Sequence, residues 1–529
     1  MTFYTDSAGI LARKAQLEPM LGHPLHAFKT NTELAQDDVL VGWGQKANTR
    51  QIRQKAHDLG LPYWQLEDGF IGYIGHPARG GKAVSLIADP VGIYYDARQP
   101  SRLEELIATP CDDSMLARAE TLTAELLRLG ITKYNCYTAD SGLPDTLTAR
   151  LHSDPRPKVL LIDQVAGDLS IPGALASEED FVAMVAAARR NHPDARLLLR
   201  THPDTRLGKK SGVLARLALD DVEVVAEHCH PHALLNSVEA VYTVSSQMGF
   251  EALLLGKAVH CFGMPFYAGW GLTHDSKTCP RRQGPIALPQ LVAAALILYP
   301  RYLDPILGQR CEVEQVLDII AGQQSPAPRY RRLYMVGFSL WKRAFMRAFC
   351  QPLAEELRFV RKLPETLADD EQVLVWGSRH PERQNAIRVE DGFIRSRGLG
   401  SNLCRPSSLS IDPVGIYFDS RRPSGLEQLL NQHELTDQEL ARGETLVDLL
   451  RQHGVSKYNV GTIKPFTPPA DGRSLVLVVG QVDGDASILT GSPVIRSNEA
   501  LLWAVRDARP EAHILFKPHP DVVAGNRAG

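Results

Sequence analysis

The chain has 529 residues, of which 44% are hydrophobic and 22% are charged, and its formal net charge is −3. This composition is typical of globular proteins and excludes the disordered and fibrous classes. The small net charge gives no indication of a polyanionic partner, so we expect no interaction with nucleic acid.

The amino-terminal sequence, MTFYTDSAGILARK, lacks the apolar segment of a secretory signal peptide. The longest apolar run, near Leu291–Leu298, is far shorter than the ~20 residues that a membrane-spanning helix needs. The eight cysteines are scattered and form no CxxC pair, a pattern typical of reduced thiols in the cytosol. We therefore expect a soluble, cytoplasmic protein that is able to bind a membrane surface only peripherally.

Short apolar segments rich in β-branched residues alternate with amphipathic helical patterns along the chain. Helices are expected at residues 116–130 and 177–191, and the second begins with Ser177 and Asp180 in the spacing of an N-terminal cap. This alternation predicts an α/β fold with mainly parallel sheets, in which ligands bind beyond the carboxyl ends of the strands. The expected strands are VLVGW (39–43), KVLLID (158–163), ARLLLR (195–200), VEVVAE (222–227), AVYTV (240–244) and AVHCF (258–262).

Several segments of the first half of the chain recur in the same order in the second half. Because the spacing between them changes only by small insertions, we interpret the chain as two tandem modules. The recurring segments are EDGFI (67–71 and 390–394), DPVGIYYD or DPVGIYFD (89–96 and 412–419), KYN (133–135 and 457–459), QVAGDLSI or QVDGDASI (164–171 and 481–488) and HPD (202–204 and 519–521).

The repeat predicts the domain boundaries. We expect a first module at residues 1–310, a linker with a proline- and arginine-rich end at 311–332, and a second module at 333–529. The second copy has no counterpart to residues 224–275 of the first. We therefore expect the second module to be truncated at its C-terminus.

Adjacent carboxylates occur in both copies, at Glu67–Asp68 and Glu390–Asp391, each followed by glycine. In an extended chain neighbouring side chains point to opposite faces, so only one carboxylate of each pair can face a cleft. A single copy would be explained by an Asp-Gly turn with a solvated glutamate. Recurrence in both modules favours Glu67 and Glu390 as general acid–base groups.

Asp168 and Asp485 follow a strand and a glycine in the recurring QVxGDxSI segment. An aspartate after glycine usually forms a turn or caps a helix. A carboxylate at the end of a strand also suits a nucleophile that attacks an anomeric carbon. The residues alone leave both interpretations open.

His202 and His519 begin the two HPD tripeptides, each after an expected strand. An imidazole can donate a hydrogen bond to a phosphate, or it can be satisfied by backbone groups at the strand end. Arg200 and Lys517 keep a positive charge two residues earlier in both copies. This pattern favours phosphate binding modestly.

The segment SSQMGFEALLLGKAV (245–259) places small polar residues before an expected helix. The free N–H groups of the helix start could hold a phosphate, Gly249 could permit its close approach, and Glu251 could accept hydrogen bonds from ribose hydroxyls. The segment matches no standard nucleotide-binding motif.

Two further segments have simpler interpretations. The histidines of HCHPH (228–232) are too close together for usual zinc spacing and are absent from the second copy, so we expect neither a metal nor a cofactor. The basic aromatic stretch at 338–349 could lie on a membrane. We favour the first helix of the second module, with Trp341 and Phe345 packed together.

Together with PFYAGWGLT (265–273), these motifs resemble those of the capsule polysaccharide β-Kdo transferase family, the KpsC-like proteins. The resemblance covers nearly all of the chain. It implies tandem glycosyltransferase B-like modules, each built of two Rossmann-like lobes around a cleft.

The resemblance also implies an activity. Members of the family transfer Kdo (3-deoxy-D-manno-octulosonic acid) from CMP-β-Kdo to a lipid-linked, Kdo-bearing acceptor and so build the poly-Kdo linker of capsular polysaccharide. Donor and product are both β, so the configuration is retained, and a double displacement through a carboxylate nucleophile explains this outcome. The implied partners are CMP-Kdo, the glycolipid acceptor, the inner-membrane surface and other capsule biosynthesis or export proteins.

The resemblance implies roles for the residues named above. Asp168 matches the nucleophile, with Asp485 as its counterpart, and Glu67 and Glu390 match the acid–base residue. The residues that match nucleotide contacts are His202 and His519 at the phosphate, and Ser245, Ser246, Gly249 and Glu251 in the cytidylate-binding segment.

The second copy departs from this pattern because it has no counterpart to SSQMGFEALL or PFYAGWG, so we expect only the first cleft to bind CMP-Kdo well. Two other functions stay open: transfer of another sugar acid, such as sialate, from a CMP donor, and a non-catalytic scaffold in the capsule synthesis and export assembly. Basic residues of the linker and the following helix would suit an anionic membrane surface; they are Arg329, Arg331, Arg332, Lys342 and Arg343.

Overall fold

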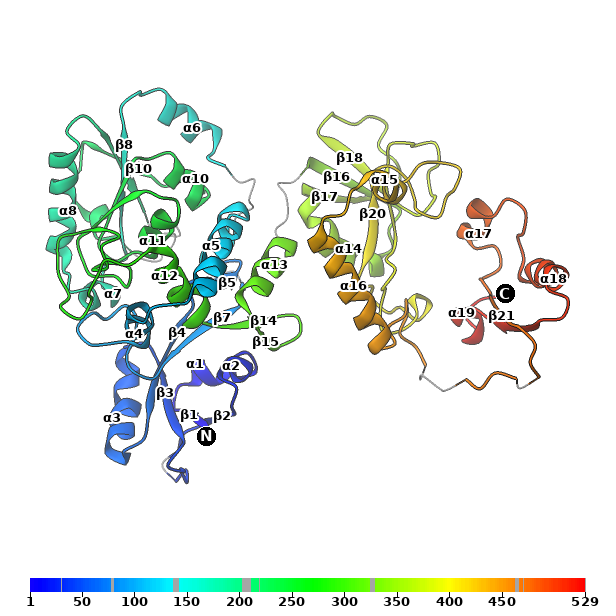
Figure 1. Cartoon of the computed structure of the whole chain (residues 1–529). Helices are drawn as coiled ribbons and strands as arrows, with labels where there is room; N and C mark the ends of the chain where they lie inside the picture. Colours follow the sequence, from blue (N-terminus) through cyan, green and yellow to red (C-terminus); the bar gives the residue numbers. More distant parts are fainter. Residues whose placement is uncertain are drawn as a thin grey trace. The chain divides into compact units, whose positions relative to one another are not determined.

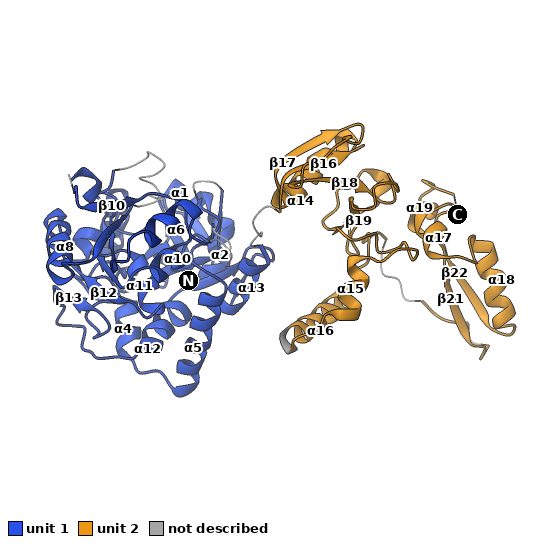
Figure 2. Cartoon of the chain, turned by 90° about the horizontal axis from the view of Figure 1, so that it is seen from above, with its two compact units in different colours: residues 1–325 blue, residues 326–529 orange. Residues whose placement is uncertain are grey.

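The chain forms two compact units, Met1–Ser325 and Pro326–Gly529 (Figure 1; Figure 2). The computed structural model describes residues 1–29, 31–77, 80–136, 142–201, 211–217, 219–323, 329–461, 466–469 and 471–528. Each unit has an α/β architecture and is described separately below.

The first sheet of the first unit has seven strands in the order β15-β14-β7-β4-β3-β1-β2. Strands β2, β1, β3 and β4 are parallel, whereas β7 runs antiparallel to β4 and β14 runs antiparallel to β7 and β15. The strands are β1 (Phe3–Thr5), β2 (Leu25–Ala27), β3 (Val39–Trp43), β4 (Tyr63–Asp68), β7 (Ser85–Asp89), β14 (Arg301–Asp304) and β15 (Gln309–Cys311), and a small hairpin follows β4 with β5 (Tyr73–Ile74) and β6 (Lys82–Ala83).

The second sheet of this unit is entirely parallel, in the order β10-β9-β8-β11-β12-β13. Its strands are β8 (Lys158–Ile162), β9 (Arg196–Arg200), β10 (Val222–Val225), β11 (Ala240–Thr243), β12 (Ala258–Cys261) and β13 (His274–Asp275). The helices of the first unit are α1 (Ala8–Ala12), α2 (Lys14–Leu21), α3 (Arg50–Leu59), α4 (Arg102–Ala108), α5 (Asp113–Arg128), α6 (Asp145–His152), α7 (Ser170–Gly173), α8 (Glu178–Asn191), α10 (Pro231–Asn236), α11 (Gln247–Leu254), α12 (Leu288–Val292), the π-helix η4 (Ala293–Leu298) and α13 (Val313–Gln323), with short 3₁₀ turns η1 (Ala47–Thr49) and η3 (Leu214–Arg216).

Strand β8 shows why its apolar run is continuous. Val159 and Leu161 pack into one apolar cluster, and Leu160 and Ile162 pack into another. Successive side chains of a strand point to opposite faces, so both faces of the second sheet are covered. Burial of both faces holds β8 in place and so positions the residues that follow its carboxyl end.

The second unit repeats the arrangement of the first. Its five-stranded sheet has the order β17-β16-β18-β19-β20, with β20 antiparallel, which corresponds to β2-β1-β3-β4-β7. Strands β21 and β22 form a parallel pair that corresponds to β8 and β9. The elements are β16 (Tyr330–Val336), α14 (Leu340–Cys350), η5 (Gln351–Leu353), β17 (Ala354–Val360), β18 (Glu371–Trp376), β19 (Ile387–Asp391), η6 (Gly400–Asn402), β20 (Leu409–Asp412), α15 (Gly425–Gln432), α16 (Asp437–Gln452), β21 (Leu475–Val479), α17 (Ala486–Gly491), α18 (Asn498–Ala508), β22 (His513–Lys517) and α19 (Pro520–Val523).

All six strands expected in the first module and both helices are present. Ser177 and Asp180 form a reciprocal capping box at the start of α8. The basic aromatic stretch forms α14, the first helix of the second unit, with the Trp341 and Phe345 rings 5.1 Å apart between centroids.

The segment expected to be a linker, residues 311–332, is not a linker over most of its length. It contains α13, whose residues Val316, Leu317 and Ile320 are buried in the core of the first unit, and its last residues begin strand β16. The division between the units lies between Ser325 and Pro326. Proline and arginine at the end of the segment marked the boundary, but the amphipathic pattern just before it belongs to a packed helix.

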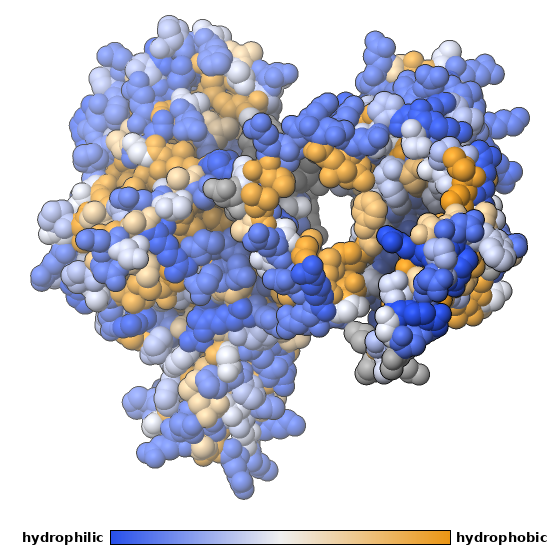
Figure 3. All heavy atoms as spheres, turned by 45° about the vertical axis from the view of Figure 1, so that its right-hand side comes forward, coloured by the Kyte–Doolittle hydropathy of each residue, from blue (hydrophilic) through white to orange (hydrophobic). Residues whose placement is uncertain are grey.

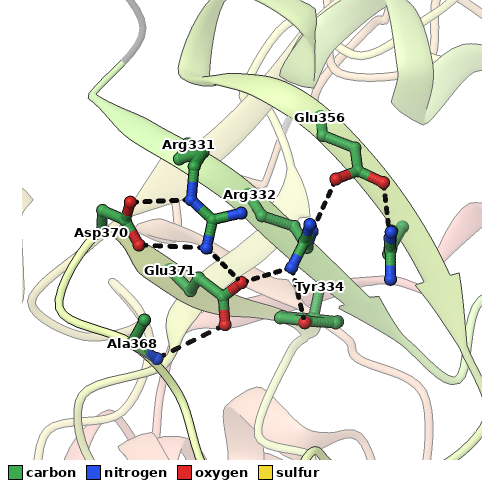
Figure 4. A network of polar contacts seen from close by, with 8 residues as sticks. Arg331, Arg332, Tyr334, Glu356, Ala368, Asp370 and Glu371 are labelled. Atoms are coloured by element: carbon green, nitrogen blue, oxygen red, sulfur yellow. Dashed lines mark hydrogen bonds and ion pairs between the residues drawn. The ribbon is translucent and has the colours of Figure 1, made fainter.

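Two of the five basic residues around this boundary, Arg331 and Arg332, are paired with acids. Arg331 binds Asp370 at 2.7 Å and Glu371 at 2.8 Å, and Arg332 binds Glu356 at 2.6 Å (Figure 4). Arg331 lowers the pKa of Asp370 through its hydrogen bond. These arginines therefore hold strands β16, β17 and β18 together, and they do not form the unneutralised surface that the sequence led us to expect for an anionic membrane.

Two properties of the chain bear on its environment. Within the described residues, no helix combines the length and the apolar character that crossing a bilayer requires. The eight cysteines, all of which are described, carry free thiols. Apolar and polar residues are interspersed over the face seen in Figure 3.

Candidate functional site

A cavity of about 590 Å³ lies in the first unit, at the carboxyl ends of strands from both of its sheets. Residues at the end of β4 and after β8, β9 and β11 line it, as expected at the carboxyl ends of parallel strands. Of the residues predicted for the site, the cavity brings together Glu67, Asp168, Ser245, Ser246 and Glu251.

The side chains of Glu67 and Asp68 have different surroundings, as we expected for neighbouring residues of an extended chain. Glu67 lines the cavity, whereas Asp68 accepts a 2.7 Å hydrogen bond from the Tyr73 hydroxyl and lies 3.6 Å from the Arg13 guanidinium. Gly69 is required because a Cβ there would lie 2.0 Å from Ser85 Oγ. The glycine of this motif therefore allows the loop to pack on strand β7.

The two oxygens of Glu67 have different surroundings. Oε1 accepts a 3.0 Å hydrogen bond from the Trp43 indole and a 3.1 Å bond from the Asp68 backbone N–H. Oε2 faces Gly44, where an added Cβ would lie 3.0 Å from it. Burial, with a contribution from Asp68, raises the pKa of Glu67, so its carboxylate is a stronger base than a solvated one.

Lys133 also lines the cavity, and the sequence patterns described above had indicated no role for it. The backbone carbonyl of Lys133 accepts hydrogen bonds from the N–H groups of Gly72 and Tyr73, which fixes the KYN loop on the EDGFI loop. The charge of Lys133 opposes the rise in the pKa of Glu67. Recurrence of KYN in both copies was the signal that could have identified this lysine.

Asp168 lies in a tight turn after β8. Gly167 has a left-handed φ of +80°, and Asp168 Oδ1 accepts a 2.8 Å hydrogen bond from the Ser170 N–H. The side chain is exposed within the cavity. Burial raises the pKa of Tyr95, and both Glu67 and Asp168 add to this rise, so the two carboxylates act on the same part of the cavity.

Gln164 connects the turn to the next strand end. Its amide Nε2 donates to Ser245 Oγ at 2.9 Å, and its Oε1 accepts from the Ser245 N–H at 2.8 Å. Nε2 also lies 3.3 Å from Ser170 Oγ. The recurring glutamine of QVxGDxSI therefore connects the loops after β8 and β11 through hydrogen bonds.

Helix α11 begins at the cavity. Ser246 is its N-cap, and Ser245, Ser246, Gln247 and Met248 line the cavity. Gln247 Nε2 donates a 2.7 Å hydrogen bond to the carbonyl of Phe70, so the helix start contacts the EDGFI loop directly. A helix N-terminus of this kind can hold a phosphate.

Gly249 does not serve the purpose we expected. A Cβ at this position would lie 2.2 Å from the Tyr267 hydroxyl and 3.0 Å from Thr243 Cγ2, so its open side faces the protein interior. The Tyr267 hydroxyl donates to the Ser246 carbonyl at 2.6 Å. Gly249 therefore allows Tyr267 to support the helix start and does not itself admit a phosphate.

Glu251 forms the buried end of the cavity. Burial raises its pKa to about 7, and the backbone N–H and the charge of Lys133 oppose this rise. His232 Nε2 lies 4.0 Å from Glu251 Oε2, and burial lowers the pKa of His232 to about 4. The pair is therefore not an ion pair at neutral pH, and a neutral imidazole faces a carboxyl that is partly protonated.

The histidine predicted at the phosphate, His202, lies outside the described residues. Arg200, two residues before it, lines the cavity but donates a 2.8 Å hydrogen bond to the Glu227 carbonyl. Among the described residues, no group of three or more His, Cys, Asp or Glu side chains is arranged to hold a metal ion.

The second unit has a cavity of about 940 Å³ that contains Glu390, Asp485 and His519. Asp485 caps α17 and accepts hydrogen bonds from the N–H and hydroxyl of Ser487, at 2.9 and 2.6 Å. His519 Nδ1 accepts from the Asp521 N–H, which leaves its Nε2 as the proton-bearing nitrogen. Burial raises the pKa of Glu390, as it does for Glu67.

Comparisons with known proteins agree with this architecture. The family model described as "Capsule polysaccharide biosynthesis protein" matches residues 38–129, 115–302, 372–467 and 469–529. The capsule polysaccharide modification protein LipA of Neisseria meningitidis serogroup B is 40% identical over 99% of this chain and 77% of its own length. The lipopolysaccharide-processing protein LpsZ of Rhizobium meliloti is 34% identical over 55% of this chain and 65% of its own length.

A solved structure of the β-Kdo 2,4 transferase of Thermosulfurimonas dismutans KpsC is 40% identical, covers 61% of this chain and 98% of its own, and superposes with a TM-score of 0.57. This share exceeds the length of the second unit, so the match includes the first unit. The α/β architecture and this superposition confirm the expected glycosyltransferase B-like fold class.

Proposed function

Since this chain belongs to the capsule polysaccharide biosynthesis protein family, we propose that it is a glycosyltransferase that transfers Kdo from CMP-β-Kdo to a Kdo-bearing glycolipid. The observation that carries this proposal is the first cavity, where a partly buried glutamate and an exposed aspartate line the same space as the start of a helix. The 40% identity to a solved β-Kdo transferase supports Kdo as the transferred sugar.

The proposed mechanism is a double displacement with retention of configuration. In the first step, Asp168 Oδ2 attacks the anomeric carbon of Kdo, the bond from that carbon to the phosphate oxygen breaks, and CMP leaves. The hydrogen bond from the Ser170 N–H to Oδ1 orients the carboxylate for this attack. The product is a Kdo–Asp168 ester.

In the second step, a hydroxyl of the acceptor attacks the same carbon from the other side and releases Asp168. Glu67 takes the proton of that hydroxyl. A carboxylate with a raised pKa is a stronger base than a solvated one, and its burial supports this assignment. Lys133 beside it would stabilise the negative charge that develops between the two carboxylates.

We assign the nucleotide to the segment at the start of α11. Ser245 and Ser246 present hydroxyls at the cavity, and the N–H groups of the helix start favour the phosphate of CMP. Glu251 would accept hydrogen bonds from the ribose hydroxyls. His202 and, in the second cavity, His519 remain proposed phosphate contacts.

The proposal includes a division between the units. We assign donor binding and transfer to the first cavity, because the start of α11 lines it together with Glu67 and Asp168. Asp485 and Glu390 keep contacts like those of their counterparts, and the Asp485→Asn variant below measures their contribution to transfer. Other capsule assembly proteins and the inner-membrane surface are proposed partners in the cytoplasm.

Mass spectrometry of the intact protein, incubated with CMP-Kdo without acceptor, tests the mechanism. We expect a Kdo-sized covalent adduct on the wild-type chain and on Asp485→Asn, and none on Asp168→Asn. Glu67→Gln should still form the adduct but should release it slowly when acceptor is added. An adduct that persists in Asp168→Asn, or full activity of that variant, would contradict the assignment of the nucleophile.

Two alternatives have distinct outcomes in the same experiment. An adduct formed with CMP-sialate and not with CMP-Kdo would show that another sugar acid is transferred. A chain that forms neither adduct nor product, and whose Asp168→Asn variant still supports capsule assembly in cells, would act as a scaffold.

A further inference from the structure

The first cavity contains a hydroxyl group that the mechanism described above does not use, that of Tyr95. Tyr95 lines the cavity, and its Oη accepts a 3.0 Å hydrogen bond from the backbone N–H of Gln45. A phenol that accepts a hydrogen bond can still donate its own proton. Among the described residues, no acceptor takes that proton, so it is available to a ligand in the cavity.

The loops on either side hold this hydroxyl in place. Gln45 follows strand β3, and its side-chain amide donates to Asp96 Oδ2 at 2.5 Å. Arg98 donates to Gln45 Oε1 at 3.1 Å and to Asp96 Oδ1 at 2.7 Å. These bonds connect the end of β3 to the DPVGIYYD loop, so the position of the Tyr95 hydroxyl is fixed before any ligand binds.

The Tyr95 hydroxyl lies beside Oε2, the oxygen of Glu67 that has no N–H donor. Gly44 has a left-handed φ of +54°, and a Cβ at this residue would lie 2.5 Å from Tyr95 Oη and 3.0 Å from Glu67 Oε2. Both oxygens therefore face the same small space, close enough for one hydroxyl group of a ligand to contact both. Glu67 adds to the rise in the pKa of Tyr95 that burial causes, as this proximity requires.

The second unit has neither this hydroxyl nor its support. Phe418 stands at the position of Tyr95 and lines the second cavity without a hydroxyl. Ser378 replaces the supporting glutamine, and its Oγ is buried with no hydrogen-bond partner among the described residues. A Cβ at Gly377 would have Glu390 Oε2 as its nearest contact, at 3.3 Å. The two units therefore share the glutamate but differ in the hydroxyl beside it.

We propose that Tyr95 is a further catalytic residue of the first site, whose hydroxyl donates a hydrogen bond to the acceptor oxygen while the acceptor hydroxyl gives its proton to Glu67 Oε2. This inference rests on the function proposed above. A hydroxyl oxygen has one proton and two lone pairs. With the proton directed at Glu67 and one lone pair bound by Tyr95, the other lone pair is left to attack the anomeric carbon.

The contact with Tyr95 strengthens during the reaction. As the acceptor proton moves to Glu67 Oε2, negative charge develops on the acceptor oxygen, and a hydrogen bond to a charged oxygen is stronger than one to a neutral oxygen. The bond from this oxygen to the anomeric carbon forms as the bond from Asp168 to that carbon breaks. Tyr95 keeps its proton throughout, since burial raises its pKa, so it orients the hydroxyl and stabilises the transition state.

The test follows the two steps separately in the complete chain. Intact-protein mass spectrometry measures formation of the Kdo adduct from CMP-Kdo, and mixing with a Kdo-bearing glycolipid then measures its acceptor-dependent loss. Tyr95→Phe should form the adduct within about threefold of the wild-type rate. Its maximal rate of adduct loss should fall about 10- to 100-fold, with a smaller change in the acceptor concentration that gives half of that rate. The matched control Tyr4→Phe, in strand β1, should change neither step.

A second variant separates catalysis from support of the fold. Incorporation of 3-fluorotyrosine at position 95 keeps the hydroxyl, so adduct loss should stay within about threefold of the wild-type rate. Equal slowing of both steps in Tyr95→Phe would mean that the hydroxyl only supports the structure. Unchanged adduct loss in Tyr95→Phe would mean that the hydroxyl does not contact the acceptor. Either result would overturn the inference.

These results also distinguish the inference from the proposed function. If the wild-type chain transfers Kdo and Tyr95→Phe releases the adduct at the wild-type rate, the proposed function stands and the role of Tyr95 is wrong. A wild-type chain that forms no adduct and transfers no Kdo would overturn both.

Discussion

The pentapeptide EDGFI lies at the end of a central strand in both units, but its last two residues have opposite surroundings. Phe70 and Ile71 are each 2% exposed, whereas Phe393 is 61% and Ile394 is 39% exposed. Phe70 packs against Phe250 in helix α11 and against Phe266, which follows strand β12.

The first half of the pentapeptide behaves in the same way in both units. Glu67 and Glu390 each accept a hydrogen bond from the N–H of the following aspartate, and Gly69 and Gly392 each pack against a serine hydroxyl. Local sequence therefore specifies the conformation of the Glu-Asp-Gly loop. Contacts with residues distant in sequence decide whether the following phenylalanine and isoleucine are buried. This difference can be tested by matched substitutions.

The largest difference is expected for Phe70→Ala and Phe393→Ala. Removing the buried Phe70 ring should destabilise the first unit by about 3–5 kcal/mol, whereas removing the exposed Phe393 ring should change the second by less than about 0.5 kcal/mol. Urea unfolding followed by the 5-fluorotryptophan signals of each unit would measure both. Equal losses would mean that Phe393 is covered in solution.

The pH dependence of stability should also separate the units. The pKa of Glu251 rises from 4.5 to about 7 on folding, so this group costs stability as the pH rises through that range. The pKa of His232 falls from 6.5 to about 4, so this group costs stability as the pH falls through its range. The two costs change with pH in opposite directions, so their pH slopes partly cancel in the wild-type first unit.

Glu251→Gln removes only the first of these costs. The variant should gain about 1–3 kcal/mol over the wild type at pH 8 and much less at pH 4. Urea unfolding of the first unit at the two pH values measures this, with the exposed Glu120→Gln as control. An equal effect at both pH values would show that Glu251 does not titrate in this range.

The shared part of the loop predicts equal effects. A Cβ at Gly69 or Gly392 would lie 2.0 or 2.1 Å from a serine Oγ, so Gly69→Ala and Gly392→Ala should each destabilise their unit by about 1–3 kcal/mol. Gly142→Ala, where an added Cβ meets nothing within 4 Å, is the control. Unequal losses, measured by the same unfolding experiment, would show that the two loops pack differently.

The smallest single effect is expected at the recurring glutamine. Gln164 is buried and bonds Ser245, whereas Gln481 is exposed. Gln164→Ala should destabilise the first unit by about 1 kcal/mol, because the Ser245 N–H loses its acceptor, and Gln481→Ala should have no measurable effect. A matching loss in Gln481→Ala would indicate a partner that covers this residue.

Much of the fold followed from local patterns. The strand VLVGW and the helix after Ser177 were predictable because apolar periodicity and capping act over a few residues. The position of Glu67 in a cavity was predictable from alternation along the strand and from the repeat. The segment 311–323 was mistaken for a linker because its helix is recognised only through its packing on the first unit.

Other parts of the site required three-dimensional information. A Cβ at Gly249 would meet the Tyr267 hydroxyl, and this contact cannot be recognised without the folded structure because Tyr267 is distant in sequence. The buried, unpaired Oδ1 of Asp391 reflects Ser396, which stands where the first copy has a tyrosine, and Arg395 from the same loop. Sequence supplies the residue types at such points, but it does not specify which of their atoms remain unpaired.

The unequal oxygens of Glu67 bear on the choice of acceptor hydroxyl. Both groups that contact Oε1 are N–H donors, so a proton on this carboxyl resides on Oε2, beside Gly44. In the proposed mechanism, proton transfer therefore has a single direction, and the acceptor sugar would present its reacting hydroxyl along that line. In such a site, the direction from which a hydroxyl approaches Oε2, the oxygen left without an N–H donor, would determine which hydroxyl reacts. Beyond Tyr95, no additional side chain would be needed to recognise that hydroxyl.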